Sequence, residues 1–387
     1  MMVLYENARI VDRDQDVMGC VLTQDDQIYY VGTTCPKVPV DQVVDLQGKV
    51  LMPAFVDLHC HLRDPGYEYK ETLETGMKAA LKGGYATLCA MANTNPVCET
   101  AQMVQEIQRR AQGLRLCRLY QSAAAGAGLG DEIPTDYAAL SQVTPVITND
   151  GKTIFSDSFM EQLLLASKQY PFFISTHCQP ERQIVARDLA LLEKVGGDLH
   201  VGHISRAETV QMIRDAKARG LTVTCEVTPH HLFGYDCDYK VNPPLRHKVD
   251  VDALLEGIKD GTVFCLATDH APHSPEDKAK GMAGISNIEY AFQVYWKVFS
   301  EHGISLQKLS ELASCNPNVR LHRNAGLIRQ GYIADLVVVD PQVEDTIQVE
   351  EMISKSKNTP FAGRAVRGRV LKTIVGGTVR YEYGHTL

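Results

Sequence analysis

Residues 199–228 read LHVGHISRAETVQMIRDAKARGLTVTCEVT, and this stretch decides the predicted fold. Apolar strands are predicted at 199–205 and at 221–228. Between them Ser205 is expected to cap a helix, with Glu208 completing an S-x-x-E capping box, and Gly220 is expected to end that helix. A strand, a helix and a strand joined by such short connections are typical of a parallel sheet covered by helices.

The same alternation extends over the middle of the chain. Six further runs are short and apolar, and segments with the apolar spacing of helices separate them. With the two strands already described they make eight, the number in a (β/α)8 barrel of the TIM type. We therefore predict an α/β fold in which residues 52–322 form this barrel, with strands in 54–61, 85–91, 116–125, 143–148, 171–178, 199–205, 221–228 and 261–269.

The two ends of the chain have a different pattern. Residues 1–51 and 323–387 consist of short strand-like runs separated by turns, among them GCVLTQDDQIYYVG at 19–32 and RGRVLKTIVGGTVRYEYG at 367–384. We predict that these two segments pair with each other as one small β-sandwich domain beside the barrel.

Composition narrows the classes of function. The net charge is −8 and no block of like charges occurs, so neither nucleic acid nor a membrane surface is an expected partner. No secretion signal is apparent, and no run reaches the roughly 20 apolar residues of a membrane span. The eleven cysteines are scattered and several lie in apolar runs, so we expect reduced, mostly buried thiols in a cytoplasmic protein.

The first polar cluster lies at the end of the first predicted barrel strand, in DLHCHLRDPG. Side chains of alternate residues share one face of a strand, so His59, His61 and Arg63 point the same way. Two histidines in this spacing can chelate one metal ion, and the arginine can bind a carboxylate through two hydrogen bonds. An H-x-H pair also occurs by chance, and most lone histidines have no ligand role. The strand end and the following Pro65-Gly66 turn favour the metal site.

Four further residues end predicted strands of the same barrel. His177 and His203 suggest a second metal position, although either alone is more often an ordinary hydrogen-bonded histidine. Asp269 follows a run apolar enough to bury it, where a carboxylate needs a partner such as a cation. Asp150 is an acidic candidate for a ligand between two metals, although its Asp-Gly sequence, judged alone, is more typical of a simple turn.

Several short motifs lie along the chain. They are HLRDPGYEYKE at 61–71, MANTNP at 91–96, HC at 177–178, GHIS at 202–205, EVTPHHL at 226–232, NPPLR at 242–246, ATDHAPH at 267–273 and SKNTPFAG at 356–363. Together they resemble the class I dihydroorotases of the amidohydrolase superfamily, and the resemblance covers about residues 45 to 375. The most specific parts are HLRDPG, NTPFAG, and the pair of NPPLR with ATDHAPH.

The resemblance implies two zinc ions on a (β/α)8 barrel, bridged by a hydroxide and by Asp150. It implies that His59, His61 and Asp269 hold the first zinc and that His177 and His203 hold the second. It assigns the metal histidine to GHIS rather than to His230 and His231 of TPHH. A carbamylated Lys152 is a minor alternative to Asp150 as the bridge. Cobalt or manganese would also suit these ligands.

The resemblance also implies the reaction, which is the reversible cyclisation of N-carbamoyl-L-aspartate to L-dihydroorotate in pyrimidine biosynthesis. In the ring-opening direction the hydroxide would attack the cyclic amide, and Asp269 would carry the proton to the ring nitrogen. The residues implied to bind the substrate are His61, Arg63, Asn93, Asn242, His273, Ala283 and Gly284.

The chain departs from the family pattern at some positions, and two alternatives stay open. Gln179-Pro180 replaces the usual Glu-Asp after HC, Ala92, Asn149, Asn287 and Tyr290 also differ, and the spacing from His177 to His203 is short. One alternative is a related cyclic amidase, such as a dihydropyrimidinase, hydantoinase or allantoinase. The other is a dihydroorotase-like subunit that depends on a partner. A homodimer is expected, and association with aspartate transcarbamoylase is a further option.

Overall fold

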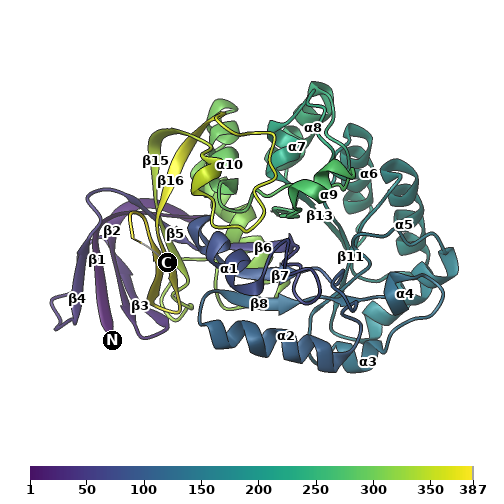
Figure 1. The fold of residues 1–387 in the computed structure, drawn as a ribbon. Coiled ribbons are helices and arrows are strands. Elements are labelled where there is room, and N and C mark those ends of the chain that lie inside the picture. Colours follow the sequence, from purple (N-terminus) through teal and green to yellow (C-terminus); the bar gives the residue numbers. More distant parts are fainter. Residues whose placement is uncertain (386–387) are drawn as a thin grey trace.

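The computed structural model describes residues 1–385 and contains parallel and antiparallel sheets (Figure 1). Each of the eight predicted runs contains a parallel strand, so the structure confirms the strand pattern. One sheet has the order β6-β7-β8 and the other has the order β14-β13-β12-β11-β10-β9. The strands are β6 (Phe55–Cys60), β7 (Tyr85–Ala90), β8 (Arg118–Gln121), β9 (Ala123–Ala124), β10 (Val146–Thr148), β11 (Phe173–Thr176), β12 (Leu199–Val201), β13 (Val223–Val227) and β14 (Cys265–Leu266).

Two connections join these sheets. β8 and β9 are consecutive in the chain, and only Ser122 lies between them. At the other side, the segment after β14 pairs with β6, because the His61 amide donates to the His270 carbonyl at 2.8 Å and the Asp269 amide donates to the His59 carbonyl at 2.8 Å. The ends of β6 and β14 therefore lie side by side.

Helices cover the outside of these strands, as Figure 1 shows for α2, α4, α5, α6 and α8. Their apolar faces pack into one large buried cluster with the strands. The α-helices are α1 (Leu73–Lys82), α2 (Ala101–Leu114), α3 (Tyr137–Leu140), α4 (Asp157–Gln169), α5 (Glu181–Val195), α6 (Ala207–Ala218), α7 (Pro229–Phe233), α8 (Lys248–Lys259), α9 (Pro275–Ala279), α10 (Ala291–Glu301), α11 (Leu306–Ser310) and α12 (Asn316–Arg320). Among residues 1–385, no helix has the length and apolar character to cross a membrane.

The two ends of the chain join in one eight-stranded sheet, which agrees with the predicted pairing of the termini (Figure 1). Its order is β17-β16-β15-β5-β1-β2-β3, and β4 pairs with β1. The strands are β1 (Met2–Asp12), β2 (Gln15–Gln24), β3 (Gln27–Gly32), β4 (Gln42–Asp45), β5 (Val50–Pro53), β15 (Leu336–Thr346), β16 (Ala365–Val375) and β17 (Thr378–Glu382). The exact domain boundaries stay a prediction.

One prediction about cysteines is wrong for two residues. Cys20 on β2 and Cys35 after β3 form a disulfide. The fold brings their Cα atoms to 5.7 Å, which is within the usual range for a disulfide. The other nine cysteines are free, and all of them except the half-buried Cys237 are buried, as expected.

The predicted capping box is also wrong. The cap position of α6 is Arg206, without a side-chain cap. Ser205 is fully buried and instead contacts Glu181 of α5: its amide donates to Glu181 Oε1 at 2.9 Å and its hydroxyl donates to Glu181 Oε2. The Arg206 amide also donates to Glu181, at 3.1 Å. The neighbouring helix therefore supplies the carboxylate that local spacing assigned to Glu208.

The contact between Ser205 and Glu181 predicts that Glu181 contributes more to the free energy of unfolding than Glu208 does. Replacing Glu181 with alanine should lower the free energy of unfolding by about 3 kcal/mol, because buried donors lose their acceptor. Replacing the exposed Glu208 with alanine should change it by less than about 0.5 kcal/mol. Guanidinium denaturation of both variants measures the two effects, and an equal loss would contradict the assignment.

Candidate metal centre and substrate cavity

The predicted site residues meet around one cavity of about 230 Å³ beyond the carboxyl ends of the parallel strands. Eleven of the predicted residues line it, while His59 is buried next to His61 beneath it. Gly151, Ala271 and Met282 also line the cavity and were not predicted. The predicted lining residues are His61, Arg63, Asn93, Asp150, His177, His203, Asn242, Asp269, His273, Ala283 and Gly284.

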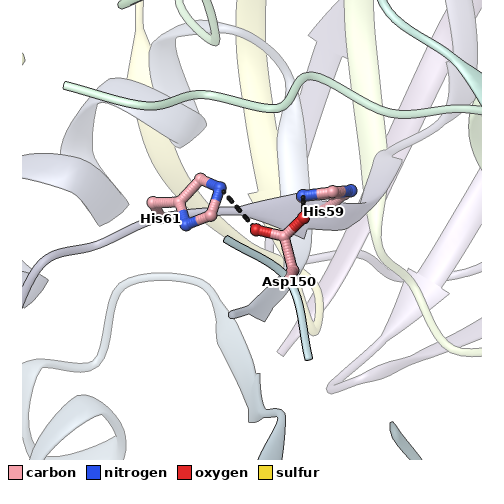
Figure 2. A group of neighbouring side chains, drawn as sticks. All are labelled: His59, His61 and Asp150. Atoms are coloured by element: carbon pink, nitrogen blue, oxygen red, sulfur yellow. Dashed lines mark ion pairs between the residues drawn. The ribbon is translucent and has the colours of Figure 1, made fainter. Parts of the chain in front are cut away.

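Asp150 lies between two pairs of histidines. Figure 2 shows its carboxylate facing the first pair, with Oδ1 at 3.3 Å from His59 Nε2 and Oδ2 at 3.3 Å from His61 Nε2. Oδ1 also lies 3.4 Å from both His177 Nδ1 and His203 Nε2. One carboxylate thus belongs to two groups of three potential metal ligands. His59 lies on β6, and the other four residues follow the ends of β6, β10, β11 and β12.

The chemistry of this cluster fits two divalent cations. Among the described residues, His59 Nε2 and Asp150 Oδ1 are buried without a hydrogen-bond partner, which is costly unless another group satisfies them. Burial by itself would raise the pKa of Asp150, but His59, His177 and His203 outweigh it and lower that pKa well below its usual value. Imidazole nitrogens around an ionised carboxylate are a typical ligand set for zinc and similar ions.

Asp269 lies after β14, next to the first histidine pair. Its Oδ1 is 3.1 Å from His61 Nε2 and 3.7 Å from His59 Nε2. Its backbone φ is +45°, and Arg63 and His203 also have positive φ values of +61° and +31°. Such conformations are unfavourable for residues other than glycine and concentrate at functional sites. Here they turn three side chains into one cavity.

A buried carboxylate behind the cluster was missed by the sequence reasoning. Glu226 on β13 is fully buried, and its Oε1 is 2.6 Å from His59 Nδ1. Its Oε2 is 3.0 Å from His200 Nε2, and Oε1 accepts the His203 amide at 3.2 Å. A carboxylate on Nδ1 leaves Nε2 of His59 free to bind a metal. The signal in the sequence was an acidic residue inside the apolar run LTVTCEVT.

Arg63 and His273 form the wall of the cavity. Arg63 Nε donates to the Pro272 carbonyl at 3.2 Å, and its Nη2 lies 3.3 Å from His273 Nε2. Burial, together with cationic Arg63 and Lys70, lowers the pKa of His273 to about 3, so the imidazole is neutral. Gly284 leaves room for this ring, because a Cβ there would lie 2.8 Å from His273 Cδ2.

The two predicted asparagines both contact histidines of the metal cluster. Asn93 Oδ1 lies 2.9 Å from His61 Nδ1, and Asn242 Nδ2 lies 3.0 Å from His177 Nε2. Both also line the cavity. They can therefore orient a ligand histidine, and a direct contact with substrate stays a prediction.

Lys152 is not a bridge between metals, which corrects the minor alternative. Its side chain is exposed and its Nζ donates to the Gly128 carbonyl at 3.2 Å, outside the histidine cluster. The Asp-Gly turn points the side chain of Asp150 inward and that of Lys152 outward. His231 is also outside the cluster, since it contacts Thr228 Oγ1 at 2.7 Å and the Pro243 carbonyl at 3.0 Å.

The departures from the family pattern leave the metal cluster intact. After His177 the chain passes through Gln179, whose amide donates to Thr153 Oγ1 at 3.0 Å, and enters α5 at Glu181. Asn287 is buried and donates through Nδ2 to the Thr268 carbonyl at 2.7 Å. The Gln179 backbone and the Asn287 side chain therefore connect the segments beside the cavity to neighbouring elements.

Comparison with known proteins confirms the resemblance. The model of the amidohydrolase family matches residues 50–380. A dihydroorotase from Clostridium botulinum (strain Eklund 17B / Type B) is 36% identical over 99% of this chain and 100% of its own length. A dihydroorotase from Bacillus caldolyticus is 38% identical over 89% of this chain and 90% of its own length.

Solved structures show the same fold. The L-hydantoinase from Arthrobacter aurescens superposes with a TM-score of 0.91 at 23% identity, over 100% of this chain and 97% of that one. The dihydropyrimidinase from Brevibacillus agri NCHU1002 gives 0.88 at 21% identity, over 100% and 97%. At these identities the likeness concerns the fold alone. From its family match and its relatives, the chain belongs to the amidohydrolase family and, within it, to the dihydroorotases.

Proposed function

We propose that the protein interconverts N-carbamoyl-L-aspartate and L-dihydroorotate by closing and opening a cyclic amide. One observation carries the proposal: Asp150 lies between two histidine pairs in a cavity whose wall holds Arg63 and His273. The cluster suits amide hydrolysis, and the cationic wall suits a substrate with a carboxylate. The relatives named dihydroorotases, at 36% and 38% identity, support this choice of substrate.

For the fold, we propose that the parallel strands form a closed (β/α)8 barrel over residues 52–322, beside a small sandwich built from 1–51 and 323–387. The backbone bonds between β6 and the segment after β14 support closure. In such barrels the active site lies at the carboxyl ends of the strands, as this cavity does. A homodimer and an association with aspartate transcarbamoylase stay predictions.

We propose that the cluster holds two zinc ions. His59, His61 and Asp269 would hold one, His177 and His203 the other, and Asp150 both. When bound, such ions lower the pKa of water and polarise a carbonyl oxygen. Glu226 would keep Nδ1 of His59 hydrogen-bonded, so that Nε2 faces the ion.

The remaining roles belong to side chains around the cavity. Asp269 would accept a proton from the attacking water at its carboxylate and then donate it to the ring nitrogen as the amide bond breaks. Arg63 and His273 would bind the substrate's carboxylate and thereby hold the amide carbonyl near Asp269. In the direction of ring closure the same groups act in reverse order. Ala283 and Gly284 would contact the ring through their backbone.

Replacement of Arg63 by alanine tests the substrate assignment. We expect kcat/KM for dihydroorotate to fall by about 10² to 10³, because a charged hydrogen-bonded pair with the carboxylate is lost. Turnover of dihydrouracil, the same ring without the carboxylate, should change little. The measurement compares wild type and variant on dihydroorotate, dihydrouracil, hydantoin and allantoin. Unchanged dihydroorotate turnover in the variant, or a wild type that prefers a neutral ring, would refute the assignment.

A further inference from the structure

Lys70 lies directly behind His273, on the side away from the cavity. It is only 6% exposed and does not line the cavity. Its Nζ is 3.3 Å from His273 Nδ1 and 3.1 Å from Asp277 Oδ2. The proposed mechanism gives this buried lysine no role.

The surroundings of Lys70 hold it in place. Asp277 compensates its charge, and the rings of Tyr67 and Tyr69 lie 5.1 and 5.4 Å from Nζ, within the range of cation–π contacts. The Lys70 carbonyl accepts the Ser356 hydroxyl at 2.7 Å. A buried ion pair is retained only when such contacts offset its desolvation.

The position of Nζ has a consequence for the histidine ring. An ammonium group has donors and no acceptor, so at Nδ1 it can only donate. A neutral imidazole that accepts at Nδ1 carries its hydrogen on Nε2. His273 Nε2 lies 3.3 Å from Arg63 Nη2, and both residues line the cavity. In this tautomer the Nε2–H of His273 and the Nη2 group of Arg63 are two adjacent hydrogen-bond donors.

Arg63 and Lys70 favour different tautomers of the His273 ring. The Arg63 guanidinium also has only donors, and a neutral imidazole accepts at one nitrogen at a time. A carboxylate in the cavity removes the competition, since it accepts from Arg63 and from Nε2–H together. Lys70 at Nδ1 favours the form of the ring that is ready for this ligand.

We propose that Lys70 is a positioning residue for carboxylate recognition: it holds His273 in the tautomer whose Nε2–H, next to Arg63, donates to the carboxylate of the substrate. The proposal rests on the proposed function. It makes Lys70 a determinant of the preference for carboxylate-bearing rings over neutral ones, although Lys70 does not touch the substrate.

Binding of orotate and uracil to the zinc-loaded protein tests the proposal. These unreactive rings differ only in the carboxylate. Lys70→Met removes the donor and should weaken orotate binding roughly ten- to hundred-fold, the value of a hydrogen bond to a charged group, while uracil binding stays the same. Lys70→Gln, whose amide can donate to Nδ1, should recover most of the affinity. Lys78→Met, which removes a lysine paired with Glu74 on α1, is the matched control and should bind both rings as wild type does.

Histidine ¹⁵N spectra with bound orotate give an independent readout. The His273 signals, identified by their loss in His273→Asn, should show an acceptor Nδ1 in wild type and a protonated Nδ1 in Lys70→Met. Orotate affinity unchanged in Lys70→Met, or equal loss of orotate and uracil in both Lys70 variants, would overturn the proposal. If Lys70→Met does not fold, failure of Lys70→Gln to bind orotate better than a His273→Asn variant overturns it. A wild type that binds uracil as tightly as orotate overturns the proposed function itself.

Discussion

Replacement of Asp150 by alanine should remove both metal ions and lower dihydroorotate turnover by about 10³-fold or more. The expectation follows from geometry, because one carboxylate lies 3.3 to 3.4 Å from all four histidines. Without it, each histidine pair loses its shared anionic ligand and the charge of two cations is no longer balanced. Metal catalysis supplies several kcal/mol of transition-state stabilisation, which corresponds to this factor.

Metal content by mass spectrometry and turnover on the same preparations measure this effect. Chelation should lower the melting temperature of wild type, because bound ligands stabilise the folded state, and should leave the Asp150 variant unchanged. Asp252→Asn is a suitable control, since Asp252 is an exposed carboxylate that pairs with Lys248 on α8. An Asp150 variant that keeps two metals per chain would contradict the bridging role.

Replacement of Asp269 by asparagine should lower kcat by about 10² to 10⁴, the usual range for loss of a general acid–base group. Asparagine keeps the shape and one oxygen that can bind a metal, but it cannot accept and return a proton. We therefore expect the variant to hold more metal than the Asp150 variant does. The structure supports this separation, because within residues 1–385 the Asp269 carboxylate forms its ion pairs with His59 and His61, at 3.7 and 3.1 Å.

Single-turnover kinetics and metal content, measured together, separate the two roles of Asp269. Loss of turnover with metal retained is the expected result. A variant that keeps near-normal kcat would exclude Asp269 as the proton carrier. Loss of turnover that addition of zinc restores in full would instead make Asp269 a ligand only.

Local sequence determined much of this protein. Strand runs with alternating side chains place His59 and His61 on one face, and the structure brings them together with Asp150. The polar residues predicted at strand ends line one cavity, because parallel strands that point the same way end at the same edge. Choosing His203 over the pair in TPHH also agrees with the structure, although that choice rested on resemblance.

Local sequence failed where the partner of a residue comes from elsewhere in the chain. Ser205 fits a capping box with Glu208, yet its partner is Glu181, which belongs to the preceding helix. Likewise, Cys20 and Cys35 pair because β2 and the segment after β3 meet. The spacing of residues along the chain does not predict such contacts between distant segments.

What only the tertiary structure decided is how the site is supported. Burial placed the Glu226 carboxylate against His59, and packing placed Lys70 behind His273. The turn after β10 places the Asp150 side chain in the site and leaves Lys152 exposed. Residue type alone does not predict which of these two side chains enters the site. Sequence pattern determines which face of a strand or helix a residue occupies. The positions of the elements around that face determine which charges and hydrogen-bond partners the residue meets.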